Sequence, residues 1–359
     1  MVDGIVRWGI VGCGDVVETK SGAATYLAEG SELVGMWNRT RSKAEEWTVR
    51  HGHGRVYGTL EDLLADPEID IVYVATPPNC HREQALAVAA AGKHCYLEKP
   101  IALSYAEAQE IRAAFEAADT RCFVAHYRRG MPRYVEAKRL IDAGVLGKVR
   151  GVQVIRTQRQ TAEELLSYEQ KPWRVRPEVS GGAHFYEGDA HMLDLIDFLV
   201  GPLVDAKLVV TNETGCYPGA DAVTLAGFTQ DRVMVSATWC YATYKAIDHF
   251  LVYGDEGSIE FPYYDNAAPM RLETVAGGAA SQVAHEGVMG GVRKGPDLEV
   301  REVAPALDAY PGLGLMQQAV DELRGVPGRI CASTLDSAMR TLAITDAAER
   351  QWRELRDAR

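Results

Sequence analysis

The chain has 359 residues, 47% of them hydrophobic, and a formal net charge of −12 at pH 7. This length allows two domains with ordinary hydrophobic cores. The negative charge argues against nucleic-acid binding, because a polyanion would be repelled and the sequence has no basic tract. No apolar run reaches the roughly 20 residues of a membrane span, and the first predicted strand leaves no room for a signal peptide. We therefore expect a cytoplasmic protein without membrane contacts.

The first predicted strand, Ile5 to Val11, leads into the turn Gly12-Cys13-Gly14-Asp15-Val16-Val17. This turn nearly matches a dinucleotide-binding fingerprint. Its first glycine makes the turn, its second lets a pyrophosphate approach, and the next helix directs its positive end at the anion. Val17 departs from the pattern, which requires a small residue there. The residues expected to bind the cofactor here are Gly12, Gly14, Asp15 and Val16.

Strands and helices then alternate. The pattern predicts strands at residues 33–37, 69–75, 94–97 and 122–125, and helices at 42–50, 81–91 and 104–118. Such alternation specifies a parallel sheet with helices on both faces, and ligands bind beyond the carboxyl ends of its strands. Four positions at those ends, namely Gly12, Asn38, Thr76 and Lys99, should meet in one dinucleotide crevice.

The segment after the second strand bears on the choice of cofactor. An acidic residue there would hold the ribose of NAD, whereas arginine accommodates the 2′-phosphate of NADP. The chain reads Asn38-Arg39-Thr40-Arg41 and offers no carboxylate. Arg39 presents a planar donor fork to a phosphate, and Arg41 could add to it. Solvated surface arginines are the alternative, so NADP is favoured and NAD remains possible.

The triplet Glu98-Lys99-Pro100 follows an apolar strand. A lysine at the end of a buried strand is costly unless it is used, which suggests a catalytic cation at Lys99. The alternative is a surface lysine whose stem covers apolar neighbours. Pro100 is expected either as a cis residue or as an ordinary loop residue.

The second predicted domain, residues 126–359, contains consecutive strands. They are expected near residues 152–155, 206–211, 222–229, 233–238, 249–253 and 258–261, with helices at 131–143, 313–323 and 334–353. This order indicates an open, largely antiparallel sheet. The glycine-rich stretch from Gly277 to Gly291 is predicted to be a mobile loop, either a lid or a surface excursion.

A helical pattern after Gly181-Gly182 carries acid–base residues. Glu187 and His191 are four residues apart, so we expect them on one helix face, with the carboxylate orienting the imidazole. The other ring nitrogen could then exchange a proton with a substrate oxygen, while Lys99 stabilises charge on that oxygen. His184, Glu187 and His191 also mimic a metal-ligand spacing. We expect no metal, because the Lys99 ammonium would repel it.

Seven cysteines are present, an odd number without CxxC spacing. They are expected to be reduced and mostly buried thiols.

Several of these motifs together resemble those of the glucose-fructose oxidoreductase, inositol dehydrogenase and MocA family. The resemblance rests on the glycine turn, Ala75-Thr76-Pro77-Pro78-Asn79 with His81, Glu98-Lys99-Pro100, and Gly181-Gly182 leading to His191 and Asp194. Within the family the chain is similar to members like 1,5-anhydro-D-fructose reductase, through His126-Tyr127-Arg128-Arg129, Pro172-Trp173-Arg174 and Cys331-Ala332-Ser333-Thr334. The family has Asp where this chain has Glu187, and usually a small residue where it has Asp189.

The resemblance implies an α/β fold with an N-terminal Rossmann domain, residues 1–125, and a C-terminal α+β domain, residues 126–359, whose open sheet face forms a homodimer or homotetramer. It also implies that Thr76, Pro77, Asn79, His81, Glu98 and Lys99 lie at the cofactor and that Tyr127, Trp173, Arg174, Asp189 and His191 lie at the substrate.

The expected activity is NADPH-dependent reduction of a keto-sugar, or the reverse oxidation of a sugar or polyol. Two alternatives stay open at this point. One is a redox-neutral glycosidase that keeps its NAD through oxidation, elimination and re-reduction. The other is a non-catalytic NADP-sensing regulator, against which the intact Lys99 and His191 argue.

Overall fold

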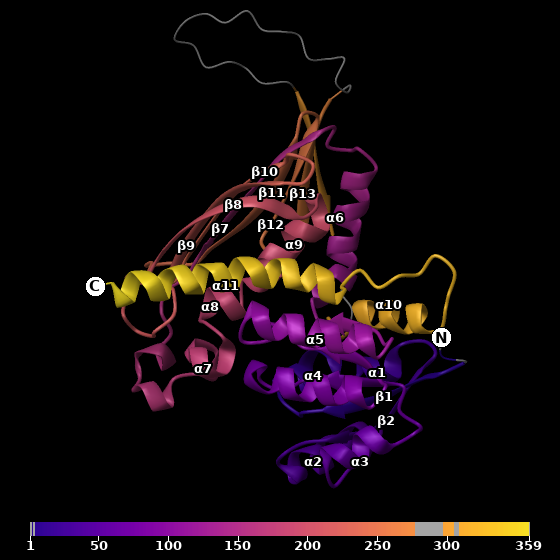
Figure 1. Cartoon of the computed structure of the whole chain (residues 1–359). Helices are drawn as coiled ribbons and strands as arrows, with labels where there is room; N and C mark the ends of the chain where they lie inside the picture. The colour runs from indigo at the N-terminus through magenta and orange to yellow at the C-terminus, as the bar shows by residue number, and fades with distance from the viewer. Residues whose placement is uncertain (1, 3, 277–296, 305–308, 359) are drawn as a thin grey trace, which may run out of the picture.

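A computed structural model describes residues 2, 4–276, 297–304 and 309–358. The stretch predicted as a mobile loop, Gly277 to Gly291, lies outside these residues. Two sheets dominate the molecule, each with its own hydrophobic core (Figure 1). No helix within the described ranges combines the length and apolarity needed to cross a bilayer.

The first sheet is parallel throughout and has the strand order β3-β2-β1-β4-β5-β6. This order changes direction beside β1, which is the arrangement of a Rossmann domain. The strands are β1 (Val6–Val11), β2 (Ser31–Trp37), β3 (Arg55–Val56), β4 (Ile71–Val74), β5 (His94–Leu97) and β6 (Cys122–Val124). The helices are α1 (Ala24–Leu27), α2 (Arg41–His51), α3 (Leu60–Ala65), α4 (His81–Ala90) and α5 (Tyr105–Ala117).

The sequence of β4 explains its central place. All four residues, Ile71 to Val74, are buried, so both faces of the strand require helix cover. Trp8, Tyr73 and Tyr96 fill one face, where their rings meet edge to face. Val72 and Val74 face the opposite core, which α4 and α5 cover. The predicted parallel, doubly covered sheet is therefore confirmed.

The second sheet has eight strands in the order β14-β13-β12-β11-β7-β10-β9-β8. Every neighbouring pair is antiparallel except β7 and β10, so the prediction of a mostly antiparallel sheet is confirmed. The strands are β7 (Val149–Thr157), β8 (Leu203–Thr211), β9 (Ala222–Thr229), β10 (Met234–Cys240), β11 (Ile247–Gly254), β12 (Gly257–Phe261), β13 (Met270–Val275) and β14 (Leu298–Val303). The helices of this region are α6 (Pro132–Asp142), α7 (Pro177–Ser180), α8 (His184–Glu187) and α9 (Ala190–Val200).

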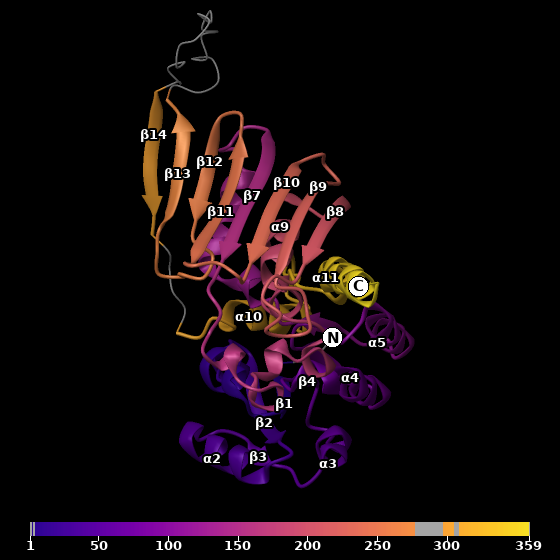
Figure 2. The same cartoon turned by 90° about the vertical axis from the view of Figure 1, so that its left-hand side faces the viewer.

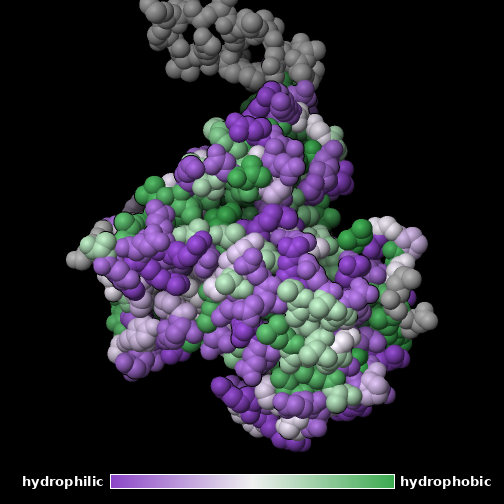
Figure 3. Space-filling model, in the orientation of Figure 1, coloured by the Kyte–Doolittle hydropathy of each residue, from purple (hydrophilic) through white to green (hydrophobic). Residues whose placement is uncertain are grey.

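One face of this sheet packs on helices and the other does not. In β10, Val235, Ala237 and Trp239 are buried in the core that includes α9, whereas Met234 and Ser236 are exposed. Figure 2 looks onto the face that does not pack on helices and shows no helix in front of it. In Figure 3, hydrophobic residues gather over the sheet above α11. Val204 and Val209 of β8 are 63% and 69% exposed.

The C-terminal helices return to the first domain. Helix α10 (Leu313–Leu323) contributes Leu315, Met316 and Val320 to the core around β1. Helix α11 (Leu335–Asp357) starts beside β6, where Phe123 bridges to Thr334. Its first half packs against the Rossmann domain and its second half against the other sheet. The predicted division at residues 125 and 126 stays a prediction.

Candidate active site

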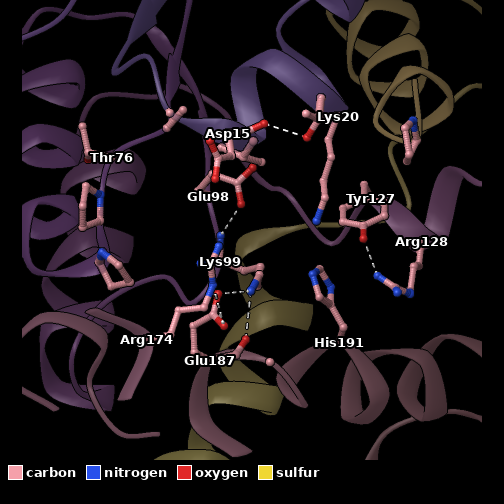
Figure 4. Close-up of a pocket in the computed structure, with 18 of the residues that line it drawn as sticks. Asp15, Lys20, Thr76, Glu98, Lys99, Tyr127, Arg128, Arg174, Glu187 and His191 are labelled. Carbon is pink, nitrogen blue, oxygen red and sulfur yellow. Dashed lines mark hydrogen bonds and ion pairs between the residues drawn. The ribbon is translucent and has the colours of Figure 1, made fainter. Parts of the chain in front are cut away.

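The carboxyl ends of β1, β4 and β5 open into a cavity of about 480 Å³. The second domain borders it with the short turns Tyr127–Gly130 and Trp173–Val175 and with the junction of α8 and α9 (Figure 4). Ligands of open parallel sheets bind at this edge. The predicted site residues that line the cavity are Gly14, Asp15, Val16, Thr76, Pro77, Glu98, Lys99, Tyr127, Trp173, Arg174, Glu187 and His191.

The two glycines after β1 have different physical requirements. Gly12 has a φ of 101°, and a Cβ there would lie 2.7 Å from the carbonyl oxygen of Ala75, so the position requires glycine. A Cβ on Gly14 would meet no atom within 4 Å. Gly14 therefore borders open space, as expected where a pyrophosphate approaches the backbone.

The departure from the fingerprint at Val17 is accommodated within the next turn. Val17 is fully buried and begins a π-helical turn, Val17–Ser21, so the helix after the glycines is not one continuous α-helix. The close packing expected of a small residue occurs instead at Gly22. A Cβ there would lie 2.3 Å from the Val17 carbonyl oxygen and 3.0 Å from the ring of Trp47.

Lys99 follows β5, and its side chain is only 11% exposed. Its Nζ donates to Oε1 of Glu187 at 2.7 Å and to the Glu187 carbonyl oxygen at 2.9 Å. The neighbouring Glu98 is buried and accepts a hydrogen bond from the Tyr73 hydroxyl at 2.7 Å. Burial raises the pKa of Glu98, although Tyr73 and Lys99 oppose the shift. The Lys99–Pro100 peptide bond is cis. Lys99 is thus a cation held by an anion inside the molecule.

His81 was expected beside the cofactor, but it does not line the cavity. Its ring is fully buried, with Nδ1 2.9 Å from the Pro100 carbonyl oxygen and Nε2 2.7 Å from that of Thr76. Burial lowers the pKa of His81, so the ring is neutral and donates through one nitrogen. His81 thus links the loop after β4 to the loop after β5. It would affect a bound cofactor only by fixing the position of these loops.

The prediction that one helix carries both Glu187 and His191 on the same face is wrong. Glu187 ends α8, and His191 belongs to α9. Between them, the backbone N–H of Asp189 donates to the carbonyl of His184, five residues earlier. This makes a wider turn than the four-residue spacing of an α-helix. The Asp189 carboxylate is held away from the cavity by the hydroxyls of Tyr241 and Tyr264. Asp189 thus lies at the junction of the two helices, with its side chain bound to the sheet domain.

Glu187 consequently contacts cations and not His191. Besides the bond from Lys99, its Oε2 lies 3.5 Å from Nε of Arg174. Burial alone would raise the pKa of Glu187, but the charges of Lys99 and Arg174 outweigh it and lower that pKa. The expectation that Glu187 orients His191 is therefore corrected: its carboxylate orients Lys99. Figure 4 shows Glu187 directed at Lys99, with His191 to one side.

His191 is a buried imidazole that faces the cavity. Its Nδ1 has no hydrogen-bond partner among the described residues. Burial, and then the charges of Lys99 and Arg128, hold the pKa of His191 well below its usual value of 6.5. The ring is therefore neutral at physiological pH and can accept a proton.

Two acid–base residues of this region turn away from the cavity. Asp189 is fully buried, and burial raises its pKa to about 7 despite the hydrogen bond from Tyr241. His184 lies with Nε2 2.6 Å from Oε1 of Glu164. His184, Glu187 and His191 therefore do not converge, and no grouping of ligands able to hold a metal occurs in the described part of the chain.

The cavity-lining residues that the sequence analysis missed include three polar side chains: Lys20, Arg128 and Asn266. They come from distant segments that form no motif, although Arg128 lay inside a quoted tetrapeptide. Arg128 Nη1 donates to the Tyr127 hydroxyl at 2.5 Å, and Lys20 Nζ lies 5.3 Å from the centre of the Tyr127 ring. Burial alone would raise the pKa of Tyr127, but the charges of Arg128, Lys20 and Lys99 lower it.

The residues expected at the adenosine end lie outside the cavity. Asn38 donates its side-chain amide to the Thr40 carbonyl at 2.8 Å and so shapes the turn after β2. Arg39 is exposed, and Arg41 pairs with Glu45 at 2.6 Å. Asn79 is also exposed, in the loop after β4. These side chains are available to a ligand that extends along the sheet edge.

Comparisons with known proteins agree with this geometry. Residues 6–126 match the family described as "Oxidoreductase family, NAD-binding Rossmann fold", and residues 134–260 match the "GFO/IDH/MocA C-terminal domain". An oxidoreductase of Formosa agariphila is 34% identical over 72% of this chain and 80% of its own length. The 1,5-anhydro-D-fructose reductase of Ensifer adhaerens is 28% identical over 70% and 74%, respectively. A levoglucosan dehydrogenase solved with NADH and L-sorbose superposes with a TM-score of 0.81 at 19% identity, covering 98% of this chain and 97% of that one.

Proposed function

The chain belongs to the glucose-fructose oxidoreductase, inositol dehydrogenase and MocA family of oxidoreductases, and on that premise we propose that it transfers hydride between NADPH and a keto-sugar or polyol. The observation that carries this proposal is the pair of Lys99 and neutral His191 on one cavity at the carboxyl edge of the Rossmann sheet (Figure 4). Hydride transfer to or from an oxygen-bearing carbon requires both a fixed positive charge and a proton carrier.

The residues after β1 fit a nicotinamide dinucleotide. Gly14 leaves space at the backbone, and Asp15 and Val16 continue the same wall of the cavity. When bound, the nicotinamide ring gives or takes the hydride. We assign the pyrophosphate to Gly12, Gly14, Asp15 and Val16, and the ring side of the crevice to Thr76, Pro77 and Glu98. The 2′-phosphate of NADP is assigned to Arg39 and Arg41, with Asn38 and Asn79 at the same end.

The protein side of the reaction follows from the charges in the cavity. Lys99, fixed by Glu187, directs a positive charge at the substrate oxygen and stabilises the negative charge that develops there. His191 accepts the proton that a hydroxyl sheds during oxidation and returns it during reduction. Tyr127, Trp173 and Arg174 line the remaining walls, where they would contact the sugar. Asp189 would affect the substrate only indirectly, through Tyr241 and Tyr264, whose hydroxyls bond to its carboxylate.

Support for a sugar or polyol comes from the relatives. Their printed activities include 1,5-anhydro-D-fructose reductase and myo-inositol 2-dehydrogenase, the latter from Thermotoga maritima at 26% identity. Both act on molecules rich in hydroxyl groups. The cavity offers such molecules several polar side chains together with Trp173, whose ring can cover an apolar sugar face.

The test is to measure oxidation of NADPH and of NADH by the purified chain against a panel of keto-sugars, with product quantified in parallel. We expect one mole of NADPH consumed per mole of polyol formed. Product without net cofactor change would indicate a redox-neutral glycosidase instead. Tight NADPH binding without turnover on any member of the panel would indicate a sensor.

A further inference from the structure

Arg128 is a buried cation that pairs with no carboxylate among the described residues. Its side chain lines the cavity, yet the residue is only 4% exposed. Its contacts are aromatic: the guanidinium lies 4.1 Å from the ring centre of Tyr263 and 5.9 Å from that of Tyr264, and Nη1 donates to Tyr127. Its Nε has no hydrogen-bond partner among the described residues. Burying a guanidinium in this way is unfavourable unless an anion completes the site.

The adjacent Arg129, in the same turn, is a structural arginine and serves as a comparison for Arg128. Its guanidinium is equally buried, and it donates to both carboxylate oxygens of Asp194, to Asp197 and to the Ala332 carbonyl. The fold thus supplies a full set of acceptors to Arg129. Within the part of the chain that the structure describes, no negatively charged acceptor contacts Arg128, which lines the cavity instead.

A second cation stands on the other side of Tyr127. Lys20 lines the same cavity, and no ion pair to it is formed by the part of the chain that the structure describes. The other two cations of the cavity, Lys99 and Arg174, share the single carboxylate of Glu187. Arg128 and Lys20 flank Tyr127 without an ion pair among the described residues, and with Lys99 they lower the pKa of the Tyr127 hydroxyl against the effect of burial. Figure 4 shows His191 between Lys99 and Arg128.

We propose that the substrate is a sugar acid whose carboxylate binds Arg128 and Lys20, with its reacting carbon held between Lys99 and His191. This assignment rests on the proposed function and narrows its substrate class. Arg128 lines the cavity, and the two coplanar oxygens of a carboxylate match the donor edge of a guanidinium. Asn266, whose Oδ1 also has no partner among the described residues, can accept a hydrogen bond from a sugar hydroxyl.

The experiment compares sugars that differ only in the carboxylate. With NADP⁺ bound, wild-type protein is titrated calorimetrically with D-glucuronate, D-glucose and D-glucose 6-phosphate, and the same compounds and the galacturonate–galactose pair are assayed for turnover. We expect D-glucuronate to bind about tenfold to 100-fold more tightly than D-glucose, the range of a charge-assisted hydrogen bond. Arg128→Gln and Lys20→Gln should each reduce that preference, while leaving NADP⁺ affinity unchanged.

Arg174→Gln is the matched control, because Arg174 lines the same cavity but is already paired with Glu187. It should leave the ratio of acid to neutral sugar unchanged. Lys20 is only half-buried, so Lys20→Gln decides the question if Arg128→Gln does not fold. Equal affinity for the acid and the neutral sugar, or a preference for the phosphate, would overturn the assignment. Binding of D-glucuronate that depends on Lys20, without turnover of any sugar, would contradict the proposed function instead.

Discussion

The ion pair between Lys99 and Glu187 is the residue-level feature on which the chemistry depends. Both side chains are about nine-tenths buried, and their atoms lie 2.7 Å apart. In a region of low polarity, a fixed ammonium stabilises a developing oxyanion far more than it would in water. The same burial makes each partner costly to remove alone, because the other is left as an unpaired charge.

Replacing Lys99 should therefore affect turnover and stability by separate routes. We expect Lys99→Met to lower turnover by on the order of 10²-fold or more, because the charge on the reacting oxygen loses its counter-charge. The double variant Lys99→Met/Glu187→Gln restores a neutral pair and should recover most of the stability without recovering turnover. Steady-state kinetics and thermal unfolding distinguish the two effects. Near-normal turnover in either variant would show that Lys99 is only structural.

Glu187→Gln tests how the carboxylate acts. Without it, the Lys99 charge is no longer neutralised near His191, so we expect the pKa of His191 to fall further below its usual value. Oxidation requires the neutral imidazole. The acid limb of its pH–rate profile should therefore move to lower pH, with reduced turnover and unchanged NADP⁺ affinity. An acid limb that stays in place or moves to higher pH would show that the Glu187 charge does not act on His191.

At the level of elements, the Rossmann half was more predictable than the site. Buried strands such as β4 are continuous apolar runs, and the glycine turn after β1 is typical of a strand that leads into a helix. The parallel sheet could therefore be predicted from the sequence. The strands β13 and β14 were not predicted, although β13 alternates the buried Met270 and Leu272 with charged residues in the period-2 pattern of a strand. Strand β14 is almost entirely exposed. The separation of α8 from α9 was also missed, because periodicity alone does not reveal that Tyr241 binds Asp189.

The turn after β2 carries the prediction for cofactor choice. Arg39→Asp should weaken NADP⁺ binding by roughly 1.5 to 3 kcal/mol, the scale of a charge-assisted hydrogen bond, and should spare NAD⁺. Arg41→Asp serves as the comparison, because Arg41 already pairs with Glu45 and should contribute less. Calorimetric titration of both cofactors measures the effect. A wild-type protein that prefers NAD⁺ would contradict the assignment of Arg39.

Helix α11 joins the sheet domain through a buried carboxyl group. Glu349 accepts a hydrogen bond from the Ala220 backbone at 3.3 Å, and burial raises its pKa to about 7, against a usual 4.5. Because the folded pKa is the higher one, the stabilisation is complete below about pH 4.5 and is lost as the pH rises towards 7.

Glu349→Gln removes this dependence. The difference in the free energy of unfolding between variant and wild type, measured by denaturant titration, should grow in favour of the variant from pH 5 to pH 8, towards a limit of about 3 kcal/mol. Glu354→Gln, at an exposed position of the same helix, is the control and should show no such trend. A constant difference across this range would indicate that Glu349 is not protonated in the fold.

At the scale of the whole molecule, the uncovered face of the second sheet is the proposed contact between subunits. On this face, Thr224 of β9 lies opposite Thr238 of β10. Such a flat face can pack closely against a second copy.

Ser236→Arg, on this face, should convert a dimer or tetramer into smaller species, because a buried unpaired charge opposes association. Gln109→Arg introduces the same charge at an exposed position of α5 and should leave assembly intact. Analytical ultracentrifugation of the three proteins measures the result. A monomeric wild type, or a Ser236→Arg variant that assembles normally, would rule out this interface.

The course of α11 also sets the mechanics of the molecule. A helix of 23 residues is a rod about 34 Å long, and this rod is anchored in one hydrophobic core at each half. A clamshell opening would have to bend the rod or pull one half free, so the freedom left to the domains is a small twist about its axis. We therefore expect the cavity between the domains to keep its width, so that the size of a ligand limits its entry.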